Sequence, residues 1–260
     1  MPAQAPARKA IVIGASSGIG RALAKALAAE GYTVGLAARR TELLESLQKE
    51  IASPTLLKPM DLRDIEGSRR LFNDLVRELG GVDLVVLNSG VNPENPDKAW
   101  DPEHEILQVN VVGFAALASE AADHFERQGS GHLVGISSIA GLRGSPKCPA
   151  YSASKSFASR LLEGLRMRLS SQGIAVTDIR PGFVDTAMIA GSRVRFWVAS
   201  CETAAAQIVA AIRARKKKVY VTRRWALVAF ALHLVPEAFL AWGNKKFRMQ
   251  PVEAKKIAAV

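Results

Sequence analysis

Cysteine is scarce in this sequence, and neither a metal-ligand pattern nor an internal repeat is present. Cys148 and Cys201 are the two cysteines among 260 residues, and their separation gives neither a zinc-type spacing nor a disulfide framework. Residues 1–9 also lack the apolar run of a secretory signal. We therefore expect no metal site and a reducing, cytoplasmic environment.

Basic residues outnumber acidic ones, with 35 lysines and arginines against 24 aspartates and glutamates and a net charge of +11. Much of the excess bunches near the C-terminal end, at Arg213, Arg215, Lys216, Lys217, Lys218, Arg223 and Arg224. No nucleic-acid recognition module accompanies these residues, so we expect no nucleic-acid partner. An anionic lipid surface or an acidic carrier protein fits this charge, and a merely solvated basic surface is the alternative.

Strand-like and helix-like segments alternate along the chain, which is typical of a parallel sheet covered by helices on both faces. The predicted strands are 10–13, 32–38, 55–60, 82–87, 132–136, 174–179 and 218–222. The predicted helices are 21–30, 41–51, 65–79, 106–125, 150–172 and 202–215, the last capped by Ser200, and residues 91–102 are expected to form a loop. The sequence therefore predicts an α/β fold, a Rossmann-like doubly wound sheet in three layers. We expect a single domain over residues 1–222 and a hydrophobic helical extension over residues 223–260.

A glycine-rich turn, Gly14-Ala15-Ser16-Ser17-Gly18-Ile19-Gly20, separates the first strand from the first helix. Glycines let backbone amides approach a pyrophosphate closely, and the N-terminus of the following helix adds partial positive charge. The spacing differs from the G-x-G-x-x-G fingerprint, but the first βα unit is the position that a dinucleotide site requires. A purely structural turn is the alternative. The residues expected to bind a dinucleotide are Gly14, Ser16, Ser17, Gly18, Ile19 and Gly20.

The second predicted strand ends in Ala38-Arg39-Arg40, without an acidic residue. In dinucleotide folds an acid at this place binds the ribose 2′-hydroxyl, whereas an arginine accommodates a 2′-phosphate. A guanidinium group also binds phosphate in a bidentate manner. The sequence therefore predicts NADP(H) rather than NAD(H), with Arg39 as the first candidate for the phosphate contact and Arg40 as the second.

Tyr151 and Lys155 stand four residues apart in a predicted helix, so they share one face. A phenol with its usual pKa near 10 is a poor base, and a neighbouring ammonium group lowers that pKa. The pair is therefore predicted to act as a general acid/base. Ser138 follows the strand 132–136, at the sheet edge where α/β proteins bind ligands, and its hydroxyl can hydrogen-bond a substrate carbonyl. A solvated helix face and a turn-forming serine are the alternative interpretations.

These elements occur in the order typical of the short-chain dehydrogenase/reductase family, which the chain resembles from Ala10 to about Thr222. The resemblance depends on the glycine turn, on Leu87-Asn88-Ser89-Gly90, on Asn110, on Ser138 with Tyr151 and Lys155, and on Pro181-Gly182-Phe183-Val184-Asp185-Thr186. Ile13 stands where many members have threonine, and Leu87 and Ser89 stand where asparagine and alanine are usual. Neither departure removes a catalytic group.

The resemblance implies a nicotinamide-dependent interconversion of carbonyl and alcohol groups. In it Ser138 would hold the carbonyl oxygen, Tyr151 would exchange the proton, and Lys155 would lower the pKa of Tyr151 and bind the nicotinamide ribose. Asn110 would position a water next to Lys155. The resemblance also assigns cofactor contacts to Asp61, Leu62, Asn88, Gly90, Pro181, Gly182, Val184 and Thr186, besides Tyr151 and Lys155. A helix N-cap is the alternative role for Asp61, and a homodimer or homotetramer is expected on the same basis.

Two further segments bear on the substrate and on location. Residues 187–199 stand where the family carries a substrate lid, and their content favours an apolar substrate unless the aromatic rings only pack on the domain: Met188, Ile189, Val194, Phe196 and Trp197. Residues 225–242 are apolar, with tryptophan at each end and basic flanks, and Pro236 is predicted to break them into two short helices. Three interpretations stay open: a cover over the substrate site or a dimer surface, a peripheral membrane contact through residues 225–247, and a membrane span.

The leading hypothesis is an NADP(H)-dependent oxidoreductase that interconverts a small lipophilic carbonyl compound and its secondary alcohol. A reductase of 3-oxoacyl groups on an acidic carrier protein is the alternative enzyme. A non-catalytic nucleotide-binding protein is a third hypothesis, which the presence of Asn110, Ser138, Tyr151 and Lys155 together disfavours.

Overall fold

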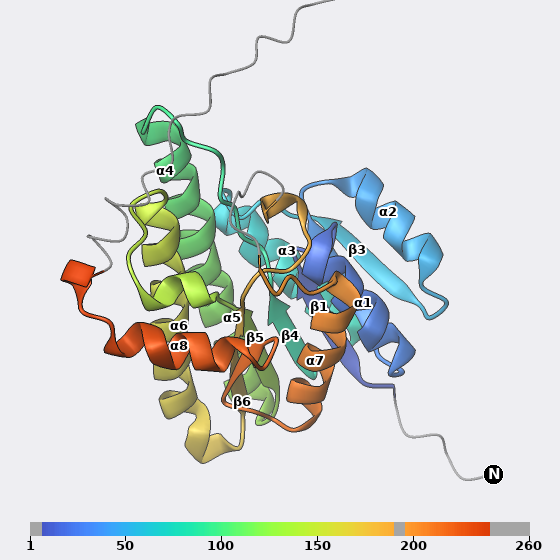
Figure 1. Ribbon diagram of the computed structural model, residues 1–260. Helices are drawn as coiled ribbons and strands as arrows, with labels where there is room; N and C mark the ends of the chain where they lie inside the picture. The colour runs from blue at the N-terminus through green and yellow to red at the C-terminus, as the bar shows by residue number, and fades with distance from the viewer. Residues whose placement is uncertain (1–6, 190–195, 240–260) are drawn as a thin grey trace, which may run out of the picture.

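Seven parallel strands form one sheet in the order β3-β2-β1-β4-β5-β6-β7 (Figure 1). The computed structural model describes residues 7–189 and 196–239. The strands are Lys9–Ile13 (β1), Thr33–Ala38 (β2), Thr55–Pro59 (β3), Leu84–Leu87 (β4), His132–Ile136 (β5), Ala175–Pro181 (β6) and Lys218–Val221 (β7). The strand order reverses between β1 and β4, which is the switch point of a doubly wound sheet. The predicted Rossmann-like α/β fold is confirmed.

Helices cover both faces of the sheet. On one face lie α1 (Gly18–Ala29), α2 (Thr41–Glu50) and α7 (Cys201–Arg213), and on the other lie α3 (Ile65–Leu79), α5 (Phe114–Gln128) and α6 (Pro149–Leu169) (Figure 1). Because successive strand side chains point to opposite faces, Val12 joins the first core and Ile11 and Ile13 join the second. Strands buried on both faces need a continuous apolar run, which explains the sequence of β4.

The helical stretch before α5 starts earlier than predicted and is not uniform. The structure has α4 (Trp100–Ile106), then a π-helical segment at Leu107–Gly113, and then α5. The predicted C-terminal boundary of the loop 91–102 was therefore wrong, because α4 already begins at Trp100. Pro102 lies in the first turn of α4, where its missing N–H costs nothing because the first amides of a helix have no intrahelical partner. The widened π-helical turn carries Asn110.

Two helix N-caps test the sequence interpretation. Ser200 caps α7 as predicted, and its Oγ accepts a hydrogen bond from the Thr203 amide at 3.1 Å. The cap of α3 is Asp64, whose Oδ1 accepts from the Gly67 amide at 2.9 Å. The alternative that made Asp61 the N-cap is therefore wrong.

After β7 the chain continues into α8 (Trp225–Leu234), the orange-red helix of Figure 1. This helix ends ahead of Pro236, as predicted, because the residue before a proline is disfavoured in the helical conformation. Residues 240–247 of the predicted membrane contact lie outside the described residues, and so do residues 240–242 of the second predicted helix. Among the residues that the structure does describe, none of the helices combines the length and apolar content needed to cross a membrane.

Candidate active site

A cavity of about 940 Å³ opens at the carboxyl end of the sheet, where the loops after β1, β2, β4, β5 and β6 meet. Ligands bind at this edge in open α/β sheets. With the exceptions of Gly20 and Asn110, the residues that the sequence assigned to the site line this cavity. These residues are Gly14, Ser16, Ser17, Gly18, Ile19, Arg39, Arg40, Asp61, Leu62, Asn88, Gly90, Ser138, Tyr151, Lys155, Pro181, Gly182, Val184 and Thr186.

The glycine turn is packed too closely for side chains at two of its positions. Gly14 has a φ of +90°, and a Cβ there would lie 2.6 Å from the Ser89 amide nitrogen. A Cβ on Gly20 would lie 2.0 Å from the Gly14 carbonyl oxygen, so Gly20 supports the turn from behind instead of lining the cavity. Asn88 holds the same carbonyl through its Nδ2 at 2.9 Å. The turn is thus a braced backbone cradle at the start of α1, the arrangement that phosphate binding uses.

The two arginines after β2 take different partners. Arg40 donates from Nη2 to the hydroxyls of Ser16 at 3.0 Å and Ser17 at 2.7 Å, so its guanidinium lies against the glycine turn. Arg39 forms an ion pair with Glu105, with Nη1 to Oε1 at 3.4 Å. Both line the cavity. Arg40 therefore lies closer to the glycine turn than Arg39 does, and which of the two contacts a 2′-phosphate stays a prediction.

Asp61 lines the cavity as a charged carboxylate. Arg63 holds it through Nε, at 2.9 Å from Oδ2, and this hydrogen bond lowers the pKa of Asp61 below its ordinary value. A paired carboxylate of this kind remains an acceptor for an N–H group. That chemistry fits the adenine contact that the family resemblance implies for it.

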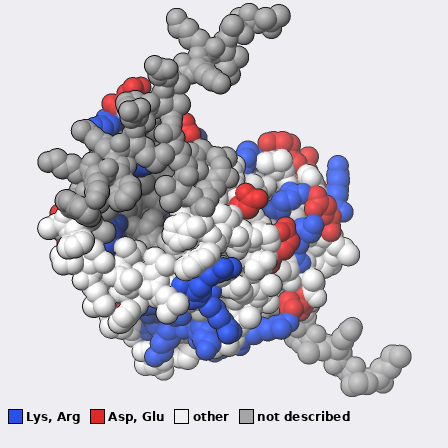
Figure 2. Space-filling view, viewed as in Figure 1, with Lys and Arg blue, Asp and Glu red and all other residues white. Residues whose placement is uncertain are grey.

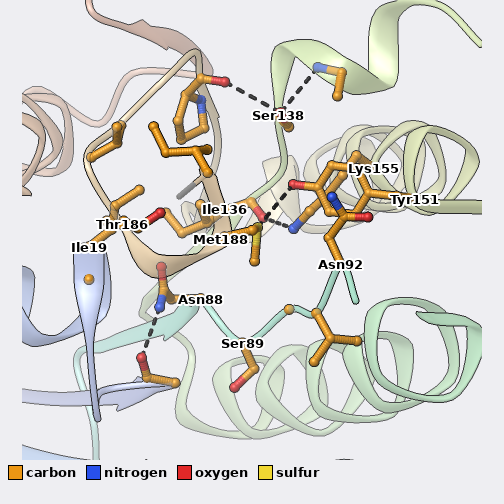
Figure 3. Close-up of a pocket in the computed structure, with 18 of the residues that line it drawn as sticks. Ile19, Asn88, Ser89, Asn92, Ile136, Ser138, Tyr151, Lys155, Thr186 and Met188 are labelled. Atoms are coloured by element: carbon orange, nitrogen blue, oxygen red, sulfur yellow. Dashed lines mark hydrogen bonds between the residues drawn. The ribbon is translucent and has the colours of Figure 1, made fainter. Parts of the chain in front are cut away.

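Tyr151 and Lys155 come from the same face of α6 and point into the cavity (Figure 3). The Tyr151 hydroxyl donates to the Met188 sulfur at 3.6 Å, and Lys155 Nζ donates to the Ile136 carbonyl at 3.1 Å. Lys155 Nζ lies 5.8 Å from the centroid of the Tyr151 ring. Ser138 enters from the end of β5, and its Oγ donates to the Pro181 carbonyl at 3.4 Å. Side chains from three parts of the chain therefore converge here.

Burial controls the protonation of both side chains on α6. It raises the pKa of Tyr151 to about 12, against an opposing hydrogen bond from Ser138. It lowers the pKa of Lys155 to about 8, against the opposing charge of Asp178. The sequence predicted a lowered pKa for Tyr151, and the structure gives the opposite direction. The reason is that the Lys155 ammonium is bonded to a backbone carbonyl, so desolvation of the phenol dominates.

Asn110 lies behind the cavity wall instead of on it. It is buried, and its side-chain amide bonds both backbone groups of Val91, accepting from the N–H at 2.8 Å and donating to the oxygen at 2.9 Å. Its Nδ2 also donates to Ser154 Oγ at 3.2 Å. A Cβ on Gly90 would lie 3.2 Å from Lys155 Nζ and 3.4 Å from Asn110 Oδ1, so Gly90 separates the two side chains. Asn110 thus fixes the backbone beside Lys155, and its expected contact with a water stays a prediction.

The far end of the cavity is apolar, but not through the aromatic residues of the expected lid. Met188 and Ile189 line the cavity, whereas Phe196 and Trp197 pack with Phe183 and Trp225 at ring-centroid distances of 4.9 to 5.9 Å. The alternative that these aromatic rings only pack on the protein is confirmed. Val194 lies outside the described residues.

Residues of α8 also reach the site, which the sequence did not assign individually. Leu232 lines the cavity, and Arg143 Nε donates to its carbonyl at 2.9 Å while the same guanidinium also bonds the Val235 carbonyl. Trp225 is 1% exposed and packs on Gly182, where an added Cβ would lie 2.0 Å from the indole ring. In the sequence, the apolar content of residues 225–242 was the signal that could have indicated these contacts. At Trp225 and Leu232 it corresponds to packing over the site.

The comparisons with known proteins agree with this geometry. The family model for short chain dehydrogenases matches residues 8–196. An uncharacterised oxidoreductase of Myxococcus xanthus is 41% identical over 188 residues, which cover 70% of this chain and 74% of that protein. A 3-ketoacyl-ACP reductase of Sinorhizobium meliloti superimposes with a TM-score of 0.73 at 27% identity, covering 82% of this chain and 96% of the other. An archaeal alcohol dehydrogenase from Thermococcus sibiricus, solved with 5-hydroxy-NADP, shares the fold with a TM-score of 0.73 at 23% identity, covering 82% of this chain and 95% of the other. The family match covers well over half of the sequence, and the chain belongs to the short-chain dehydrogenase family of oxidoreductases.

Proposed function

We propose that this chain is an NADP(H)-dependent oxidoreductase that interconverts a lipophilic carbonyl compound and its secondary alcohol. The observation that carries the proposal is the convergence of Ser138, Tyr151 and Lys155 on the same cavity as the glycine turn. Lys155 is only 6% exposed. A lysine on a solvated helix face would not be buried in this way, because burial of a charged group is costly unless the group is used or paired.

Tyr151 is the proposed proton donor in the reductive direction. A pKa of about 12 keeps its phenol protonated at neutral pH, as a general acid requires. The Ser138 hydroxyl is proposed to hold the carbonyl oxygen in reach of that proton, since both side chains line the same cavity. A bound nicotinamide cofactor would supply the hydride.

Lys155 is the proposed electrostatic partner of Tyr151. With a pKa of about 8 it carries its charge for most of the time at pH 7. Its ammonium group stabilises negative charge on the phenol oxygen as the proton leaves. In the direction of alcohol oxidation the same charge is proposed to oppose the effect of burial and so to favour the phenolate that accepts the proton.

The polar end of the cavity suits a phosphorylated dinucleotide. Gly14 and Gly20 leave no room for side chains, so backbone amides and the N-terminus of α1 are available to a pyrophosphate. Arg40 lies on the hydroxyls of Ser16 and Ser17, and the two residues directly after β2 are arginines, with no acid there to repel a 2′-phosphate. These features support NADP(H) over NAD(H).

The apolar end of the cavity supports a lipophilic substrate. Met188 touches the Tyr151 hydroxyl, and Ile139, Ile189 and Leu232 also line this region. A second candidate is reduction of 3-oxoacyl groups on an acidic carrier protein. It is favoured by two further cations that line the same cavity besides Arg39, Arg40 and Lys155, namely Arg143 and Lys147.

The experiment is a carbonyl panel monitored by NADPH absorbance, with aliphatic ketones, aromatic ketones and 3-oxoacyl thioesters. The wild-type chain is expected to turn over at least one class, and Tyr151→Phe to lose at least about 100-fold in turnover while NADPH still binds. Tyr32→Phe is the matched control, because this tyrosine stands at the start of β2, away from the cavity. Normal turnover by Tyr151→Phe would refute the assignment. NADPH binding by the wild-type chain without turnover of any class would favour a non-catalytic protein.

A further inference from the structure

One side of α8 is apolar and exposed to solvent. Leu227, Phe230 and Leu234 have 71%, 68% and 68% of their surface exposed. They recur three and four positions apart, so they form one stripe along the helix. On the opposite side, Trp225 and Ala229 are 1% and 2% exposed and pack on the protein. A contiguous exposed apolar stripe of this kind marks an interaction surface more often than an ordinary protein surface.

Basic side chains adjoin this stripe. No acidic residue occurs between Glu202 and Glu237, whereas seven lysines and arginines lie between positions 213 and 224. Of these seven, Arg213 alone forms an ion pair within residues 7–189 and 196–239, and its partner is Glu30. Figure 2 shows the resulting basic patch next to the uncharged surface over α8. Lys218 also faces the charge of Glu163, which forms its ion pair with Arg160, so the patch keeps an excess of positive charge among the described residues.

The basic patch and the helix form one continuous surface. Lys216, Lys218 and Arg223 line a shallow hollow that also includes Ala226, on the first turn of α8. A group bound among these cations would therefore lie directly beside the apolar stripe. The hollow lies against α7 and β7, on the side of the molecule away from α2 and α3 (Figure 1).

We propose that this surface docks on an anionic lipid membrane, with Leu227, Phe230 and Leu234 among the acyl chains and Lys216, Lys218 and Arg223 on the lipid phosphates. A membrane surface offers both chemistries side by side, anionic headgroups above hydrocarbon. An isologous contact with a second copy would bring two such basic patches into one interface, where they repel. The helix has 10 residues, about half the length of a membrane span, so it lies in the interface plane.

The inner side of the same helix faces the catalytic cavity. Leu232 lines the cavity, and Arg143 fastens the carbonyl end of α8 to its rim. Docking through the outer stripe therefore brings the apolar end of the cavity close to the lipid. Docking itself does not depend on the proposed reductase activity, and it is measured without substrate.

The test is flotation of the full-length chain with vesicles of phosphatidylcholine, with or without about 30% phosphatidylglycerol. We expect binding to the anionic vesicles, weakened by salt. Lys218→Glu with Arg223→Glu is expected to lower the partition coefficient at least about thirtyfold. Leu227→Ser with Phe230→Ser is expected to lower it at least about tenfold.

Matched controls keep the result specific to this surface. Lys49→Glu with Arg70→Glu makes the same change of charge on α2 and α3, and Trp100→Ser removes an exposed aromatic side chain on α4. The controls are expected to float like the wild-type chain, and all variants to keep the wild-type far-UV circular dichroism and NADPH binding. Failure of the wild-type chain to float, or flotation of both test variants like wild type, would overturn the proposal. The proposal would also be overturned if sedimentation velocity showed that the test variants lose a dimer that the wild-type chain forms, while their binding to vesicles is unchanged.

Discussion

Replacement of Arg40 by alanine is expected to separate NADPH binding from NADH binding. The guanidinium group lies on Ser16 and Ser17, at 3.0 and 2.7 Å from their hydroxyls, which is the place proposed above for a 2′-phosphate. NADH lacks this phosphate. The substitution therefore removes a charge that only NADPH uses, together with a tether on the glycine turn that both cofactors use.

The magnitude follows from the exposure of Arg40. A hydrogen bond to a charged group contributes about 1.5–3 kcal/mol, which corresponds to roughly 10- to 150-fold in affinity. Arg40 is exposed, so solvent screening places the loss of NADPH affinity nearer tenfold. Loss of the serine contacts is expected to change NADH affinity by less than about threefold, because one of these hydrogen bonds is exposed and the other only part-buried, and each contributes little net free energy. Arg39→Ala is expected to cost less NADPH affinity than Arg40→Ala, because Glu105 already pairs with Arg39 at 3.4 Å.

The assay is isothermal titration of both cofactors into the wild-type chain, Arg40→Ala, Arg39→Ala and a surface control, Arg69→Ala, whose partners are Glu66 and Glu120. Selectivity is the ratio of the two dissociation constants. The reasoning is refuted when the wild-type chain binds NADH as tightly as NADPH. It is also refuted when Arg40→Ala weakens both cofactors equally, since the arginine then acts only on the glycine turn.

Three further predictions concern stability and pH. Trp225→Ala is expected to lower the free energy of unfolding by about 3–5 kcal/mol, because the indole is 1% exposed and fills the space on Gly182. Urea denaturation measures this loss, and a loss below about 1 kcal/mol would contradict the prediction. The rate is expected to fall above pH 8 as Lys155 loses its proton, and Asp178→Asn to move that alkaline limb to lower pH, because the Asp178 charge raises the pKa of Lys155; an unmoved limb would argue against this coupling. Burial lowers the pKa of His132 to about 4, so as the pH falls the unfolded state binds a proton before the folded state does. The free energy of unfolding is therefore expected to fall by at most about 3 kcal/mol between about pH 6.5 and pH 4. His132→Gln is expected to remove this loss, and denaturation measured across that pH range tests it.

The fold was predictable because its signals are local. Strands buried on both faces are continuously apolar, and glycines, prolines and helix caps separate them from helices, so the strand positions follow from pattern alone. The site residues were predictable for a related reason. Asn88 directly follows β4 and Ser138 is the second residue after β5, so a parallel sheet brings both to one edge, which Tyr151 and Lys155 reach from one face of α6.

The features that sequence did not predict depend on distances across the fold. Whether Arg39 or Arg40 reaches the glycine turn is decided by Glu105 and by Ser16 and Ser17, which lie far away in the sequence. The pKa direction of Tyr151 depends on how deeply the phenol is buried, which no local pattern encodes. The α4 helix was missed because proline normally ends a helix and only a first-turn position tolerates it.

The C-terminal helix explains why an apolar segment can leave several interpretations open. Residues 225–234 are apolar on every side, and such a helix is either buried or at a membrane. In the folded chain each side meets a different environment. Trp225 packs on the loop after β6, Leu232 lines the cavity, and Leu227, Phe230 and Leu234 remain exposed beside the basic patch. The helix is therefore apolar on all sides for two reasons: its inner side packs on the protein and lines the cavity, and its outer side forms the proposed membrane contact. The sequence alone does not distinguish these two sides, whereas the tertiary structure does.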